Sequence, residues 1–192
     1  MQRSTLIYIM IIFISIFVFS AIFPYPIFSP YTNITTKNMT ELNNYCESER
    51  TLETNQNVAL LNVEWADCIN YILPINAEIE LIDPETKTSL FATRIGGKNH
   101  ADIEFDELSF KALKSTCQNW SWHRKSVLIK LNENCYLPAS LACYPHGLTN
   151  NNTSGHFCLH FKNSKTHGTN KIDVEHQKKI EKLQNDFQKI MQ

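Results

Sequence analysis

The chain has 192 residues, a formal net charge of −1 and a sequence pI near 6.6. Its lysines are scattered and form no basic block, so nucleic acid is not an expected partner. Residues 57–192 are enough to bury one ordinary hydrophobic core. We therefore expect a single globular domain over that range.

Residues 1–29 are predicted to direct the chain out of the cytoplasm. Arg3 precedes an apolar run from Leu6 to Phe23, which Pro24 ends. This pattern is typical of a secretory signal peptide, and cleavage would follow Ser20. The run also approaches the roughly 20 residues of a membrane span, so an uncleaved anchor is the alternative. Either way the domain is secreted or extracytoplasmic and meets a membrane only through this segment.

The polar residues 30–56 predict a flexible linker. The chain carries six cysteines, which in an exported protein indicate disulfides, and no C-x-x-C spacing that would suggest a zinc ribbon or a thioredoxin-type site. N-glycosylation sequons, which are compatible with a glycoprotein, occur at Asn33, Asn38, Asn119, Asn151 and Asn152.

Strands dominate the predicted elements of the domain. Alternation of apolar residues predicts strands over 59–65, 77–81, 90–95, 127–131 and 136–143. The segment Asp83–Lys87 supplies the turn of a hairpin, and Gly96-Gly97 ends its second strand.

Two helices complete the prediction. Asp106 caps a helix over 107–117, whose inward residues are predicted to be Leu108, Ala112 and Leu113. Asp173 caps an amphipathic C-terminal helix with its apolar face formed by Ile180, Leu183, Phe187 and Ile190. The predicted fold class is mainly β (α+β): an antiparallel β-rich domain with one inserted helix and a C-terminal amphipathic helix.

The segment Gly155–Phe161 carries the most reactive side chains. On a strand His156, Cys158 and His160 share one face, while Phe157, Leu159 and Phe161 form an apolar face opposite. Neighbours at i and i+2 are roughly 6.5 Å apart, close enough for a thiol–imidazole pair or for two ligands of one metal. His156 and His160 are roughly 13 Å apart on a straight strand, too far to hold one metal together.

Three interpretations of Cys158 follow from the residues. It is a nucleophile that a neighbouring imidazole activates, or it is bridged to another cysteine such as Cys143, or it ligates zinc. A zinc site would use His156 with Cys158, or Cys158 with His160, and a third ligand from a loop. The candidates for that ligand are His146, His100, Asp102 and His167.

Two further clusters are candidates for substrate contacts. His100 and Asp102 follow the glycine pair and would orient one another or a substrate; otherwise this stretch is a polar turn. Trp120, Trp122 and Arg124 would form a sugar- or peptide-stacking patch, or else the core and rim of a sheet.

These blocks, taken in order, resemble a largely uncharacterised family of exported bacterial envelope proteins. The resemblance spans about residues 77–180 and covers 96–104, 120–124, 145–147, 155–161 and 164–170. It implies that the histidine clusters form one site.

A shorter resemblance concerns the L,D-transpeptidase signature. His146-Gly147 followed by Ser154-Gly155-His156-Phe157-Cys158 is similar to the His-Gly and Ser/Thr-His-Gly-Cys segments of those enzymes. Those enzymes have a β-rich catalytic domain and act on peptidoglycan stem peptides through an acyl-enzyme on cysteine. The resemblance implies Cys158 as nucleophile, His156 as its base and His146 lining the site. The substrate-binding residues would be His160, His100, Asp102, Arg124, Trp122 and His167.

The leading hypothesis is therefore an exported L,D-transpeptidase-like cysteine enzyme that acts on peptidoglycan or cell-wall peptides without a cofactor. The alternatives are a non-catalytic wall-binding module that uses Trp120, Trp122 and Arg124, and a zinc hydrolase that uses His156, Cys158 and a loop ligand.

Overall fold

The computed structural model describes residues 58–117, 119–147 and 155–191. The predicted signal or anchor and the linker lie outside the described residues. Among the described residues, no helix has the length and apolar character needed to cross a membrane.

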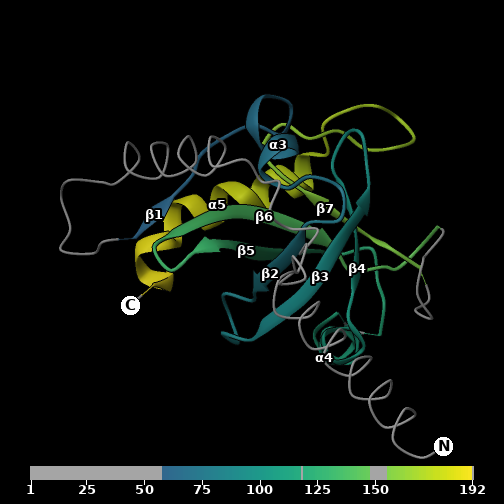
Figure 1. The fold of residues 1–192 in the computed structure, drawn as a ribbon, viewed down its shortest axis with the longest axis horizontal. Helices are drawn as coiled ribbons and strands as arrows, with labels where there is room; N and C mark the ends of the chain where they lie inside the picture. Colours follow the sequence, from purple (N-terminus) through teal and green to yellow (C-terminus); the bar gives the residue numbers. More distant parts are fainter. Residues whose placement is uncertain (1–57, 118, 148–154, 192) are drawn as a thin grey trace, which may run out of the picture. The chain divides into compact units, whose positions relative to one another are not determined.

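A closed six-stranded barrel forms the body of the domain (Figure 1). Its strands follow the order β6-β5-β2-β3-β4-β7, and pairing of β7 with β6 closes the sheet. All the pairs within this ring are antiparallel, and β1 adds to β6 in parallel at the side. The strands are β1 (Ala59–Leu60), β2 (Glu78–Ile82), β3 (Ser89–Gly96), β4 (Ala101–Phe105), β5 (Arg124–Asn132), β6 (Cys135–Ala142) and β7 (Phe157–His160). The β-rich antiparallel prediction is confirmed.

The hairpins appear where the sequence predicts them. β2 and β3 pair across the turn that begins at Asp83, whose carboxylate accepts a hydrogen bond from the Glu85 N–H. β5 and β6 pair across the turn at 133–134. Strand β3 ends at Gly96, and Gly97 has a φ of 92°, a left-handed conformation that favours glycine.

Two strand predictions were incomplete. The strand predicted over 59–65 is reduced to β1, because Trp65 begins a π-helical turn (η1, Trp65–Ile69) that continues into α3 (Asn70–Ile72). The Trp65 indole donates to the Lys98 carbonyl at 2.9 Å, and the Arg94 guanidinium lies 4.8 Å from its ring centre. Strand β4 was missed: Ala101, Ile103 and Phe105 alternate with Asp102 and Glu104, but this stretch after the glycine pair was interpreted as a polar turn or a substrate-contact cluster.

Helix α4 (Glu107–Thr116) begins at the predicted cap, where the Asp106 carboxylate accepts a hydrogen bond from the Ser109 N–H at 2.6 Å. Its predicted inward face was partly wrong: Leu113 is buried, but Leu108 and Ala112 are exposed. The helix is instead rotated so that Ser109 is buried and its hydroxyl accepts the Phe91 N–H of β3.

Helix α5 (Val174–Ile190) covers the outside of β5 and β6 (Figure 1). The predicted cap is confirmed, because the Asp173 carboxylate accepts the N–H groups of Glu175 and His176. The predicted apolar face is confirmed as well. Buried Ile180, Leu183 and Phe187 lie on it, and partly buried Ile190 follows them.

Candidate functional site

Strand β7 separates the barrel core from a small cavity. Phe157 and Leu159 are fully buried among the core residues, whereas Cys158 and His160 on the opposite face line a cavity of about 180 Å³. This is the alternation that the sequence predicts. The other side chains around the cavity are His100, Trp122, Arg124, Ala142, His146, Thr166, His167, Asp173 and His176.

A two-residue bridge brings His146 to the strand that carries Cys158. The backbones of His146 and His156 exchange two N–H···O=C hydrogen bonds, each 2.9 Å long. Gly147 and Gly155 flank this bridge with φ angles of 69° and 138°. A Cβ on Gly147 would lie 2.4 Å from the His156 ring, and one on Gly155 would lie 2.7 Å from the His146 nitrogen. Both glycines therefore permit the close approach on which the site depends.

Cys158 and His146 form a thiol–imidazole pair. The Cys158 Sγ lies 3.3 Å from His146 Nε2, and His146 Nδ1 lies 2.9 Å from the Tyr144 carbonyl oxygen. A carbonyl only accepts hydrogen bonds, so Nδ1 carries the proton and Nε2 presents a lone pair to the sulfur. The sequence placed His146 in the catalytic group, lining the site, and gave the role of base to His156; the contact with sulfur is made by the His146 ring. A donor atom of His156 also lies within 4.8 Å of the sulfur.

The sulfur itself is a thiol at rest. Burial raises the pKa of Cys158 to about 12, and the nearby Asp102 carboxylate adds to that effect while Arg124 opposes it. A preformed thiolate is therefore disfavoured, and the proton must leave when a bond to sulfur forms.

Asp102 lies at the centre of a second group of polar side chains, which contains three histidines. Its Oδ1 lies 2.9 Å from His167 Nε2, 3.4 Å from His100 Nε2 and 3.8 Å from His156 Nε2. Burial pushes the pKa of Asp102 upward, but the close approach of His100 and the charges of the surrounding imidazoles outweigh it, so the pKa lies below its ordinary value. The carboxylate is therefore ionised and attracts protons or cations to this side of the cavity.

Three buried imidazoles stack along the wall of the cavity. The His160 ring lies 4.2 Å from that of His100 and 3.8 Å from that of His176. The Nδ1 atoms of His160 and His176 pair with the hydroxyls of Ser164 and Ser140. Burial and neighbouring charged groups lower the pKa of His160 well below its usual range and that of His176 to about 3, so both rings are neutral.

His176 is the site residue that the sequence reasoning missed. It lies on α5 one turn before Ile180, on the same face as the apolar residues. A histidine that interrupts the apolar stripe of an amphipathic helix was the available signal.

The mouth of the cavity combines an ion pair with exposed aromatic rings. Arg124 Nη2 donates a hydrogen bond to Asp173 Oδ2 at 2.8 Å, and the two side chains form an ion pair. The Trp122 side chain is 56 % exposed and stacks on Tyr144 with ring centres 4.8 Å apart. Trp120 packs into the core against Phe157 instead, so the two tryptophans divide between core and rim.

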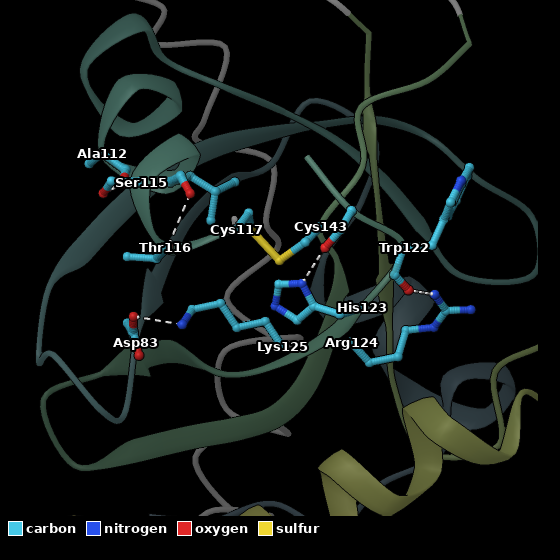
Figure 2. The surroundings of a disulfide bond; sticks show 12 residues. Asp83, Ala112, Ser115, Thr116, Cys117, Trp122, His123, Arg124, Lys125 and Cys143 are labelled. Atoms are coloured by element: carbon cyan, nitrogen blue, oxygen red, sulfur yellow. Dashed lines mark hydrogen bonds and ion pairs between the residues drawn. A yellow bond between two sulfur atoms is a disulfide. The ribbon is translucent and has the colours of Figure 1, made fainter. Parts of the chain in front are cut away.

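A disulfide fixes the frame behind this mouth. Cys117 at the end of α4 is bonded to Cys143, directly after β6 (Figure 2). The interpretation in which Cys158 pairs with Cys143 is therefore excluded, and Cys158 is a free cysteine among the described residues. Figure 2 also shows Trp122 and Arg124 on the segment that runs beside this disulfide.

Two groups of side chains offer donors for a metal ion, and they share one sulfur. One group contains His146, His156 and Cys158, and the other contains His100, Asp102, Cys158 and His167. Within each group the donor atoms all lie within 4.8 Å of one another. His160 belongs to neither group, although the sequence paired it with Cys158 as a half-site.

Comparison with known proteins finds no matching protein-family model, no matching curated protein and no matching solved structure.

Proposed function

We propose that this protein is an exported cysteine acyltransferase of the L,D-transpeptidase type that acts on peptidoglycan-type peptides. The observation that carries the proposal is the 3.3 Å contact between Cys158 Sγ and His146 Nε2, in a ring whose Nδ1 is held by a backbone carbonyl. A nucleophile, a base and a group that orients the base are the parts that covalent acyl transfer needs.

In the proposed reaction, the Cys158 sulfur attacks a substrate amide carbonyl while its proton passes to His146 Nε2. The carbon–nitrogen bond then breaks, the amine leaves with that proton, and the acyl group remains on sulfur as a thioester. An amine or water then attacks the thioester carbonyl and passes a proton to His146. The carbon–sulfur bond breaks, and the Cys158 sulfur takes that proton back as the thiol. This assigns the base role to His146, and His156 becomes the residue that packs on Gly147 and supports the bridge.

The substrate class rests on the resemblance of His146-Gly147 and Gly155–Cys158 to the transpeptidase signature. The cavity offers a peptide two kinds of contact, since Trp122 supplies an aromatic surface at its mouth and Arg124, paired with Asp173, lies at its wall. The volume of about 180 Å³ suits one residue of such a peptide rather than a whole stem.

The test is to incubate the purified protein with disaccharide-tetrapeptide muropeptides. We expect an acyl adduct on Cys158 by intact-mass spectrometry, released by hydroxylamine as a thioester should be. Cys158→Ala should give no adduct and His146→Gln should form it far more slowly, while His123→Gln, which changes a histidine outside the cavity, should behave as the parent protein. Unchanged turnover in Cys158→Ala would exclude the proposal.

A non-catalytic wall-binding module is the second candidate, favoured by the exposed Trp122–Tyr144 stack. Trp120 cannot contribute as first proposed from the sequence, because it packs against Phe110 and Phe157. Under this function, Trp122→Ala should abolish sedimentation with purified cell wall, and Cys158→Ala should not.

A zinc-dependent hydrolase would use His146, His156 and Cys158, which are three donors with a fourth position for water. Metal analysis separates it from the acyltransferase. The hydrolase requires stoichiometric zinc for turnover, whereas the acyltransferase works after chelation.

A further inference from the structure

The group of donors that meets Cys158 without His146 has the composition of a metal site. His100, Asp102 and His167 meet the same sulfur there, and their donor atoms lie within 4.8 Å of one another. We propose that these four side chains bind one zinc ion, and that zinc bound there withdraws Cys158 from chemistry.

Strand register holds two of the four donors together. Asp102 of β4 and Cys158 of β7 are direct partners in the antiparallel ladder, so their side chains project from the same face of the sheet at the same level. His100 stands two residues before Asp102 and projects from that face as well. The alignment therefore depends on backbone hydrogen bonds and not on flexible side chains.

The loop that carries His167 is tied to the His100 segment. The Lys165 N–H donates to the Asn99 carbonyl at 3.0 Å, and the Asn99 amide donates to the Thr166 carbonyl at 3.3 Å. His167 then reaches Asp102 from outside with half of its side chain exposed. One ligand is thus accessible to solvent, which provides an entry path for an ion.

The tautomer of His100 is set for metal binding. The side chain is only 1 % exposed, and its Nδ1 donates to the Lys165 carbonyl at 2.7 Å. Nε2 is therefore the ring nitrogen left for a ligand, and within the described part of the chain it has no hydrogen-bond partner. It faces Asp102 Oδ1 across 3.4 Å, so both atoms are placed to bind one cation. A carbonyl on the outer nitrogen is the usual support of a metal-bound histidine.

The donor chemistry selects zinc over harder cations. Two imidazoles, one carboxylate and one thiolate suit a tetrahedral zinc ion, whereas calcium and magnesium prefer sites made of oxygen. Bonds of about 2.0–2.3 Å place tetrahedral ligands about 3.3–3.8 Å apart. The Asp102 oxygen lies 3.4 Å from His100 Nε2 and 2.9 Å from His167 Nε2, so small side-chain movements complete the geometry.

Zinc binding has a consequence for the reaction, and only this consequence rests on the proposed function. A sulfur that donates its lone pair to zinc is no longer available to attack a carbonyl. Zinc held by His100, Asp102 and His167 would then keep the Cys158 sulfur inactive, and removal of zinc would restore its reactivity.

The test begins with the purified chain after chelation and dialysis, titrated with Zn²⁺ by calorimetry and with Co²⁺ by absorption. We expect one equivalent to bind, a thiolate-to-cobalt charge-transfer band, and protection of Cys158 from iodoacetamide by equimolar zinc. Loss of an outer support of a metal ligand costs about 10–100-fold in affinity, so loss of a ligand in His167→Gln or Asp102→Asn should cost at least about 100-fold. Cys158→Ser should abolish the charge-transfer band.

His123→Gln is the matched control, because it removes a histidine outside both groups and should leave the affinity unchanged. The proposal is overturned if no stoichiometric zinc binds, or if His146→Gln weakens binding while His167→Gln does not. Neither outcome bears on adduct formation by the zinc-free protein, so failure of this site and failure of the acyltransferase function are distinguishable.

Discussion

The inner face of β7 carries Phe157 and Leu159, which are fully buried in the barrel core, whereas its outer face carries Cys158 and His160, which line a polar cavity. One strand therefore serves stability on one side and chemistry on the other. The outer face tolerates reactive groups because apolar packing on the inner face fixes the backbone. We expect substitutions on the two faces to have separable effects.

The largest expected effect is that of Cys158→Ala on the outer face. Adduct formation with muropeptides should fall to the background level, because no other described cysteine is free. The free energy of unfolding should change by no more than about 1 kcal/mol, since no core packing is lost. Intact-mass spectrometry and urea denaturation measure the two quantities. A strongly destabilised variant would contradict the separation of the two faces.

His146→Gln should have the second-largest effect on adduct formation. Loss of a positioned general base lowers the rate by about 10²–10⁴-fold. His156→Gln is the comparison variant, and we expect a smaller decrease because the sulfur contact at 3.3 Å belongs to His146. Single-turnover rates of adduct formation measure both. A larger decrease for His156→Gln would return the base role to His156.

Phe157→Ala tests the inner face. The ring lies 5.2 Å from Phe105 and 5.4 Å from Trp120, centre to centre, and its removal leaves a cavity in the barrel. We expect a loss of about 3–5 kcal/mol in the free energy of unfolding, measured by urea denaturation, and a smaller loss for Phe157→Leu. A loss below about 1 kcal/mol would show that this face does not carry the core.

The smallest effect concerns the ion pair that ties the start of β5 to the cap of α5. Burial pushes the pKa of Asp173 upward, but the hydrogen bonds from Arg124 and the His176 N–H, with the charge of Arg124, outweigh it and lower the pKa. The ionised carboxylate therefore adds stability above the ordinary aspartate pKa of about 3.9, and this stability is lost as pH falls through the lower folded value.

Asp173→Asn keeps a capping side chain but removes the charge. We expect it to cost about 1 kcal/mol at pH 7 and to become equal to the parent protein in acid, whereas Asp173→Ala should remain less stable at both pH values. Urea denaturation at pH 7 and in acid measures this. If Asp173→Asn lowers the free energy of unfolding equally at both pH values, the ion pair does not account for the loss.

Much of the framework was predictable because its signals are local. The caps at Asp106 and Asp173, the hairpin turn and the alternation along β7 depend on residues close in the chain. The inward face of α4 was not predictable, because the hydrogen bond from the Phe91 N–H of β3 to Ser109 sets which face of the helix is buried. β4 was missed, although Ala101, Ile103 and Phe105 alternate with polar residues, because the stretch follows directly on a glycine pair and was interpreted as a polar turn.

The sequence alone determined that a thiol lies between two imidazoles on one strand face, since the alternation of side chains in a β-strand fixes that arrangement. Tertiary structure decided which imidazole touches the sulfur, because the bridge between His146 and His156 joins segments across a loop. It also decided that Cys117 takes Cys143 and leaves Cys158 free, and that Asp102 lies opposite Cys158. Those choices depend on strand register and barrel closure, which bring together residues that no local pattern pairs.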